Sequence, residues 1–488
     1  MNRNSHIAVH LEADPEAGTQ DAVPLEGMPF RLLIMANLGG RGAPSFQPRP
    51  LRIDRDDFDE VFARVRPAVT TRGEAAGMQI SFDELDDFHP DRLFSRLPGF
   101  QSLRSLRARL DDPRTFQSAA RELLGEAEPA AASGQPVPAG GSLLDQVLDL
   151  AGGPSPVPVA RPSTPPADDF RAHIRSLVAP HIVPGEDPRK AGLVDRVDVA
   201  TGEILRQILH DPAFQAVESA WRAIFLLVRR IETGGDLQIH VLDATRDDIE
   251  ADRAAGGAAL RKVLVDDVRT APWSVVVSDL AFGPDPTDLQ LLAHLAGLAR
   301  AAGAPLIAAA DPMIAGCPGF DSTPDPENWI AEPAPAWSAF RRSAVAPWIG
   351  LALPRILLRM PFGLGADECE TFEFEELGSP PGHGHYLWGS GAYLCGLLLA
   401  ESFTASGWQM RPGTHRDLAG LPLHMFTLDH EAHAKPCAES WMTERAAERL
   451  IERGLMPIAS MKGLDSVRLV RFMSVADPQT GLAGRWKR

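Results

Sequence analysis

Residues 203–230 have the sequence EILRQILHDPAFQAVESAWRAIFLLVRR. Apolar side chains recur there at the three- and four-residue spacing of a buried helix face, on both sides of Asp211-Pro212. Proline suits the first turn of a helix, and aspartate suits the N-cap position before it. The stretch therefore predicts a helix hairpin or a kinked helix with a wide buried stripe, formed by Ile204, Leu205, Ile208, Leu209, Phe214, Val217, Trp221, Phe225 and Val228.

The composition indicates a globular protein with several domains. The chain has 488 residues and 44% of them are hydrophobic, which is enough for two or three domains with substantial cores. A net charge of -17 argues against a surface that binds nucleic acid. The sequence shows neither a signal peptide nor an apolar run long enough to span a membrane, so we expect a cytoplasmic protein without membrane insertion.

Two regions of regular structure flank a stretch rich in Pro, Ala and Gly at residues 126–167. This composition is typical of a linker, so we expect one domain at residues 1–125 and another at 168–488. The first reads as a small α+β domain with strands at 30–36, 51–53 and 79–82. In the second, strands at 237–243, 273–279 and 305–310 alternate with helical patterns, which predicts a mainly parallel βαβ sheet. A further α+β region follows Trp337.

Aspartates follow or end the three predicted strands of the second domain, namely Asp243, Asp279 and Asp311. Carboxylates at the carboxyl ends of parallel strands can hold a magnesium ion. Aspartate is also a common residue for starting a loop or capping the next helix, and no glycine-rich phosphate loop follows these strands. We therefore favour turn and cap roles over a metal site.

Several histidines in the last third of the chain raise the alternative of a zinc site. They are His383, His385, His424, His430 and His433, with Cys437 beyond them. The pair His430 and His433 has i, i+3 spacing in place of the i, i+4 spacing of a zinc protease helix, so ordinary hydrogen bonds are the preferred interpretation. The chain also lacks a GxSxG nucleophile motif, and we predict no catalytic residue, cofactor or metal.

An apolar block at residues 348–363 contains Arg355 and Arg359 and is followed by the glutamates of FEFEE, which are Glu373, Glu375 and Glu376. Arginines between apolar neighbours are expected to pair with acids inside the protein or across a contact. The glutamates have two interpretations, because they also fit a solvated charged face. Together with Trp221 and Arg222, these residues are the candidates for structural or interface roles.

Several of these motifs together resemble a known family. HDPAFQAVESAWRAIFLLV, LALPRILLRMPFG, FEFEE and YLWGSGAYLCG resemble, in this order, the large subunit (VipB/TssC) of the bacterial type VI secretion contractile sheath, over about residues 195–475. PFRLLIMANLGG and LPGFQSLRSLRARLDDPRTF are similar to the small subunit (VipA/TssB) of the same sheath. The chain thus resembles a fusion of two subunits that are normally separate.

The resemblance implies a structural, non-enzymatic role. Sheath subunits of this family form a helical tube whose contraction drives an inner tube out of the cell, which requires interfaces with two stable packings. The implied partners are other sheath subunits, the inner tube protein, baseplate components and a recycling AAA+ ATPase. Large subunits of the family continue into a C-terminal interlocking segment that we do not find after Val475. The alternatives are therefore a sheath body subunit, or an adaptor, end piece or regulator that does not polymerise, with a metal-dependent α/β enzyme less favoured.

Overall fold

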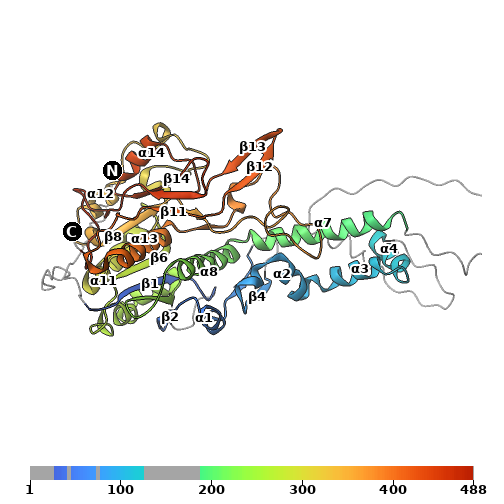
Figure 1. The fold of residues 1–488 in the computed structure, drawn as a ribbon, viewed down its shortest axis with the longest axis horizontal. Helices are drawn as coiled ribbons and strands as arrows, with labels where there is room; N and C mark the ends of the chain where they lie inside the picture. The colour runs from blue at the N-terminus through green and yellow to red at the C-terminus, as the bar shows by residue number, and fades with distance from the viewer. Residues whose placement is uncertain (1–26, 41–45, 73–76, 126–186, 487–488) are drawn as a thin grey trace, which may run out of the picture. The chain divides into compact units, whose positions relative to one another are not determined.

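A computed structural model describes residues 27–40, 46–72, 77–125 and 187–486 (Figure 1). They form two compact units. Unit 1 contains the residues up to Ala68, Ala216–Met360 and the chain from Tyr386 on, and unit 2 contains Val69–Gln215 and Pro361–His385. The predicted linker at 126–167 lies outside the described residues. The domain boundaries expected from the sequence differ from this division and stay predictions.

The core of unit 1 is a nine-stranded sheet with the order β11-β15-β14-β8-β7-β6-β1-β5-β2. Its neighbouring strands from β14 to β5 are parallel, whereas β2, β15 and β11 pair antiparallel. The predicted α/β and α+β class is confirmed. The strands are β1 (Phe30–Ala36), β2 (Leu51–Ile53), β5 (Leu237–Asp243), β6 (Val275–Phe282), β7 (Leu306–Ala310), β8 (Ile349–Leu353), β11 (Asp417–Ala419), β14 (Met456–Ser460) and β15 (Ser466–Leu469).

Strand β1 comes from the N-terminal part of the chain but lies between β5 and β6 (Figure 1). The three predicted parallel strands exist as β5, β6 and β7, yet β5 and β6 are not neighbours, because β1 separates them. The sequence FRLLIMA is almost continuously apolar, which is typical of a parallel strand covered on both faces. Six of its seven residues are buried.

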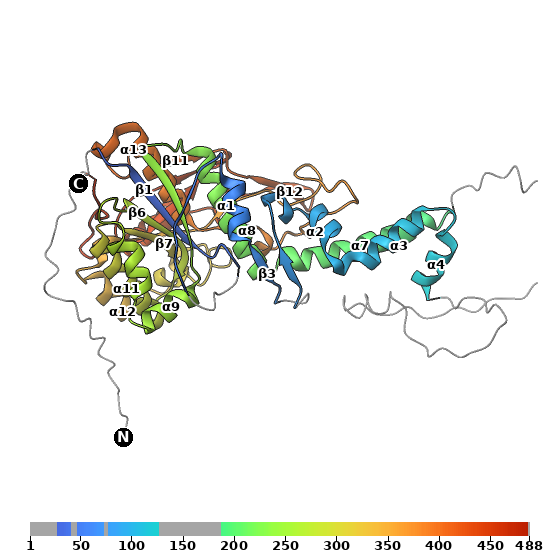
Figure 2. The same cartoon turned by 90° about the horizontal axis from the view of Figure 1, so that it is seen from below.

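Helices cover both faces of this sheet (Figure 2). Leu33 and Met35 of β1 belong to the core cluster that includes Leu291 and Leu292 of α11. On the other face α13 packs on β1, β6, β7 and β8, and its Gly396 lies close to Val277. The α-helices of unit 1 are α1 (Phe58–Val65), most of α8 (Pro212–Arg230), α9 (Arg246–Ala254), α10 (Ala258–Arg261), α11 (Pro286–Ala302), α12 (Pro335–Arg341), α13 (Gly391–Ser406) and α14 (Glu444–Glu452).

Two short antiparallel pairs complete the strands of unit 1. Strand β9 (Ile356–Leu357) pairs with β10 (Trp388–Gly389), and β12 (His424–Leu428) pairs with β13 (Glu431–Lys435).

Unit 2 is largely helical and contains one hairpin. Strand β3 (Ala68–Thr70), whose first residue belongs to unit 1, pairs with β4 (Gln79–Ser81). The long helix α7 packs against α2, α3 and α4, and Arg107 of α3 pairs with Asp198 of α7 at 2.7 Å. Among the described residues of unit 2, the α-helices are α2 (Pro90–Arg96), α3 (Gln101–Asp111), α4 (Phe116–Leu124) and α7 (Lys190–Leu209).

The predicted break at Asp211-Pro212 is confirmed. Helix α7 ends at Leu209, α8 begins at Pro212, and the Asp211 carboxylate accepts hydrogen bonds from the N–H groups of Ala213 and Phe214. The helical pattern between β5 and β6 forms two separate helices, because Gly256 and Gly257 have positive φ angles and separate α9 from α10. None of the helices in the described ranges has the length and apolar character needed to cross a bilayer.

Candidate functional site

The loop that follows β1, residues 37–40, is held by side chains from distant parts of unit 1. The indole Nε1 of Trp221 in α8 donates a hydrogen bond to the carbonyl oxygen of Leu38 at 3.0 Å. The Asp243 carboxylate at the end of β5 accepts hydrogen bonds from the N–H groups of Leu38 at 2.8 Å and Gly39 at 2.9 Å. Leu38 and Gly39 are buried, so these bonds satisfy backbone groups that water does not reach and fix the loop directly after β1.

Both glycines of this loop are required by close approach. A Cβ atom at Gly39 would lie 2.6 Å from Oδ2 of Asp243. Gly40 has a φ of +70°, and a Cβ atom there would lie 2.3 Å from the carbonyl oxygen of Ala68. A larger residue at either glycine of NLGG would therefore displace the loop.

Trp221 is fully buried and packs against α1. Its ring centroid lies 4.5 Å from that of Phe62 and 5.8 Å from that of Phe58. The same α8 surface extends to Phe225, whose ring lies 5.3 Å from Phe58. Trp221 thus connects three elements that are distant in sequence: α1, the loop after β1, and α8.

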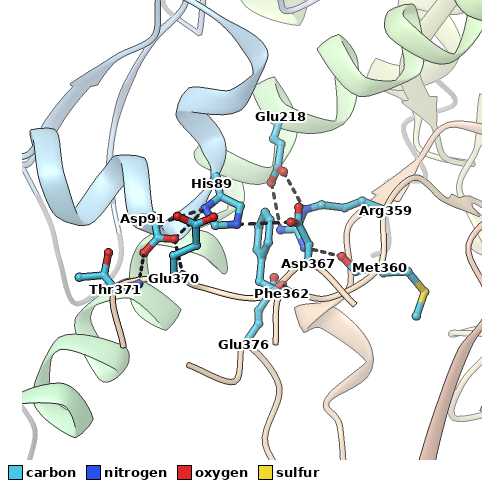
Figure 3. Close-up of polar contacts among 10 residues, drawn as sticks. All are labelled: His89, Asp91, Glu218, Arg359, Met360, Phe362, Asp367, Glu370, Thr371 and Glu376. Carbon is cyan, nitrogen blue, oxygen red and sulfur yellow. Dashed lines mark hydrogen bonds and ion pairs between the residues drawn. The ribbon is translucent and has the colours of Figure 1, made fainter. Parts of the chain in front are cut away.

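The buried carboxylate of Glu218 pairs with Arg222, one helical turn later in α8, and with Arg359. Figure 3 shows the pair with Arg359. Its Oε1 lies 2.7 Å from Nε of Arg222 and 2.7 Å from Nε of Arg359. Glu218 is fully buried and the side chain of Arg359 is 8% exposed, so both charges are largely removed from water. Burial alone would raise the pKa of Glu218, but the charges of Arg359 and Arg222 outweigh it and hold this pKa below its usual range.

Arg355 lies in a different environment from Arg359. Its side chain is 49% exposed and pairs with Glu439, whose carboxylate also accepts a hydrogen bond from the Arg355 N–H at 3.2 Å. The expectation that both arginines pair with acids fits these contacts, but the sequence did not single out either acid, Glu218 or Glu439.

The three glutamates of FEFEE, all in unit 2, lie in different environments. Glu376 is 1% exposed, and its Oε2 accepts a hydrogen bond from the N–H of Phe362 at 2.7 Å (Figure 3). Glu375 is exposed, and its Oε1 accepts a hydrogen bond from the N–H of Leu364 at 2.9 Å. Glu373 is exposed to solvent. Glu375 and Glu376 therefore bind backbone groups within their own segment, residues 361–385.

The phenylalanines of FEFEE attach this segment to the helices of unit 2. Phe372 and Phe374 are both buried, and the ring of Phe372 lies 5.2 Å from that of Phe94 in α2. Asp91, near the start of α2, accepts hydrogen bonds from the N–H groups of Glu370 and Thr371 (Figure 3). The phenylalanines that alternate with the acids in FEFEE are therefore the apolar anchors of this segment.

The residues considered for metal binding have other contacts. Asp311 caps a short helix through the N–H of Met313, as the cap interpretation predicts. Asp243 instead accepts hydrogen bonds from the loop after β1, and Asp279 lies inside β6 and not at its end. His385 stacks on His210 with ring centroids 4.0 Å apart, and Nδ1 of His424 lies 2.8 Å from the hydroxyl of Tyr386. In the described ranges, no group of three or more His, Cys, Asp or Glu side chains is arranged to hold a metal ion.

Glu218 is the residue of this site that sequence reasoning missed. A signal was present, because Glu218 lies within the predicted apolar stripe, next to Val217 and four residues before Arg222. An acid at such a position indicates a buried ion pair.

Comparison with protein families finds a match in each of two parts of the chain. Residues 191–476 match the VipB (EvpB) family of tail sheath N-terminal domains. The chain belongs to this sheath family. Residues 1–124 match the VipA family of the type VI secretion system. Strands β1 and β2 therefore lie in the VipA-like part, and the other strands of the nine-stranded sheet lie in the VipB-like part.

A curated relative gives the same assignment for the VipB-like part. The chain is 28% identical over 289 residues to the type VI secretion system sheath protein TssC1 of Pseudomonas aeruginosa. The matched region is 56% of this chain and 58% of the relative, so the chain spans somewhat more than half the length of that protein.

Replacement of Trp221 tests whether this residue joins the two family regions. Trp221→Ala leaves a large cavity and is expected to lower the free energy of unfolding by about 3–5 kcal/mol. Trp221→Phe keeps a ring but leaves the Leu38 carbonyl without its donor, at a cost of about 1–3 kcal/mol. Urea unfolding followed by circular dichroism measures both. Equal stability of all three proteins would show that Trp221 is not core.

The buried pair of Glu218 and Arg359 makes a second prediction. Glu218→Gln leaves the Arg359 guanidinium buried without a counter-charge, at an expected cost of about 3 kcal/mol or more in urea unfolding. The control is Glu327→Gln, because Glu327 and its partner Arg445 are 62% and 71% exposed and their pair contributes about 1 kcal/mol or less. Similar losses of stability in the two variants would contradict the expectation that the buried pair contributes more than the exposed pair.

Asp279, in the middle of β6, gives a prediction for pH. Burial, with a smaller effect of Asp243, raises the pKa of Asp279 from 3.8 to about 7, although its carboxylate accepts a hydrogen bond from the N–H of Asn37. Between these two values the folded protein holds a proton that the unfolded chain has released, so this contribution to stability falls as pH rises to about 7.

Asp279→Asn removes that dependence. The melting temperature of the variant, relative to the natural sequence, should therefore increase between pH 5 and pH 8 in scanning calorimetry. Asp311→Asn, after the neighbouring strand β7, is the matched control and should show no comparable increase. A difference for Asp279→Asn that is constant with pH would refute the assignment.

Proposed function

We propose that this protein is a structural component of the type VI secretion contractile sheath, in which the small and large subunits are combined in one chain. It assembles with like or partner subunits to form or modulate the tube that drives effector injection. It acts in the cytoplasm, beside the inner tube protein, baseplate components and a recycling AAA+ ATPase.

One observation carries this proposal: β1 of the VipA-like part lies between two strands of the VipB-like part. Such a sheet needs both parts at equal stoichiometry, because an absent β1 would leave the facing edges of β5 and β6 unpaired. A single chain supplies the two parts in that ratio and at high effective concentration.

The proposed role is mechanical and not enzymatic. A contractile assembly does its work through the free-energy difference between two packings of its subunits, so its requirements are rigid bodies and interfaces, not a catalytic group. The contacts of the candidate site agree with a rigid unit 1. Trp221 and Asp243 hydrogen bond to the backbone of the loop after β1, and Glu218 forms a buried ion pair with Arg359.

Electron microscopy tests the proposal on the full chain, expressed alone and together with its partner subunits. We expect ordered tubes in at least one of the two preparations. Discrete particles of folded protein in both would overturn a sheath body role and favour a non-polymerising adaptor, an end piece or a regulator. Stoichiometric bound metal in elemental analysis, together with discrete particles, would favour the metal-dependent enzyme.

A further inference from the structure

The hairpin of β12 and β13 in unit 1 is a two-stranded sheet of its own. Its turn residues Asp429 and His430 have φ angles of 50° and 66°, as in a type I′ turn, and Leu428 pairs with Glu431 directly beside the turn. No strand among the described residues pairs with the outer edge of either β12 or β13 (Figure 1). Open strand edges of this kind are templates for pairing with another chain.

The outer edge of β13 is accessible. Glu431, Ala432 and His433 are exposed, while Ala434 and Lys435 are partly buried. Because antiparallel ladders alternate and the pair beside a two-residue turn is hydrogen bonded, the backbone N–H and C=O groups of Ala432 and Ala434 point to the outer edge. These are the groups that an added strand would bond.

The sequence of β13, Glu-Ala-His-Ala-Lys, is complementary to itself when a second copy runs antiparallel. Centred on His433, that register places Glu431 opposite Lys435, Ala432 opposite Ala434, and His433 opposite His433 of the other copy. Residues 431, 433 and 435 share one face of the strand, so the acid and the base meet directly. The outward backbone groups of Ala432 and Ala434 also meet one another in this register, as an antiparallel ladder requires.

We propose that β13 pairs antiparallel with β13 of a second copy of this protein, about a twofold axis at His433. The two hairpins then form one four-stranded sheet, with two Glu431–Lys435 pairs across the interface. Strand β12 lacks this complementarity, because self-pairing about Phe426 would place His424 opposite Leu428.

The surroundings of the hairpin favour this contact. The ring of Phe426 stacks on His433 with centroids 5.6 Å apart and on His424 at 5.7 Å, so an aromatic row runs along the face that carries Glu431 and Lys435. The Lys435 ammonium lies over the rings of Tyr386 and Trp388 at 5.5 and 5.6 Å. Burial there lowers the pKa of Lys435, and the charges of Asp321 and Glu439 partly oppose this effect.

A contact of this symmetry closes on itself and yields a dimer, unlike the head-to-tail contacts that build a tube. The proposal therefore does not depend on the proposed sheath function. One five-residue strand is a small interface, so the dimer should dissociate on dilution.

Variants that exchange the charges of Glu431 and Lys435 test the register of the proposed β13 pairing on the full chain. Sedimentation equilibrium, after large assemblies have been pelleted, should show a monomer–dimer equilibrium. Glu431→Lys or Lys435→Glu places like charges opposite each other and should weaken the dimer by about tenfold or more. The double variant E431K/K435E restores the pairs and should recover most of the affinity. Glu448→Lys on α14 makes the same change in net charge at an exposed site away from the hairpin and should have little effect.

A disulfide tests the twofold axis directly. Directly opposed residues of an antiparallel pair lie within the Cα separation that a disulfide requires, so His433→Cys should give a covalent dimer on oxidation with diamide. His430→Cys, in the exposed turn of the same hairpin, is the matched control and should stay monomeric on a non-reducing gel.

A monomer at all concentrations, or a dimer that the charge variants do not weaken, would overturn the proposal. Equal crosslinking of the two cysteine variants would overturn the register. None of these results bears on tube formation, which is scored separately by microscopy.

Discussion

Strand β1 pairs with β5 from Phe30 to Ala36 and with β6 from Leu32 to Met35, and the order of the sheet depends on this pairing. A parallel strand in the middle of a sheet has both edges hydrogen bonded and both faces covered. Without β1, β5 and β6 would each expose an edge, and the core residues Leu33 and Met35 would be lost. Strand β1, although it comes from the N-terminal part of the chain, is therefore an internal component of the sheet of unit 1.

Helix α8 stabilises this arrangement through groups of different kinds. Trp221 supplies apolar area and one hydrogen bond to the loop after β1, whereas Glu218 supplies a buried charge that two arginines compensate. Buried ion pairs contribute little net stability compared with apolar packing, but they strongly disfavour arrangements in which one partner is left alone. The Glu218 cluster therefore disfavours any arrangement that leaves Glu218 or Arg359 buried without its partner.

The sequence was informative where the determinants are local. The break at Asp211-Pro212, the buried stripe with Trp221 and the strands β1, β5, β6 and β7 all follow from spacing and turn chemistry within a few residues. The insertion of β1 could not be predicted in this way, because FRLLIMA is compatible with any central parallel position and its partner β5 lies about two hundred residues away. Glu439 was missed for the same reason, since an arginine at 355 does not specify which distant acid it meets. Glu218 was missed although its place in the apolar stripe, four residues before Arg222, was a local signal. The burial of Trp221 could be predicted, because it follows from the position of this residue on the apolar face of its own helix.

Native-state hydrogen exchange of the β1 amides, read by mass spectrometry or NMR on the full chain, tests the central claim most directly. If β1 is an interior strand, the amides of Leu32–Met35 should exchange as slowly as those of Val276 and Val277 in β6, through opening of the whole sheet. Rapid exchange of Leu32–Met35, with β5 and β6 still protected, would show that the sheet is stable without β1 and would contradict the account.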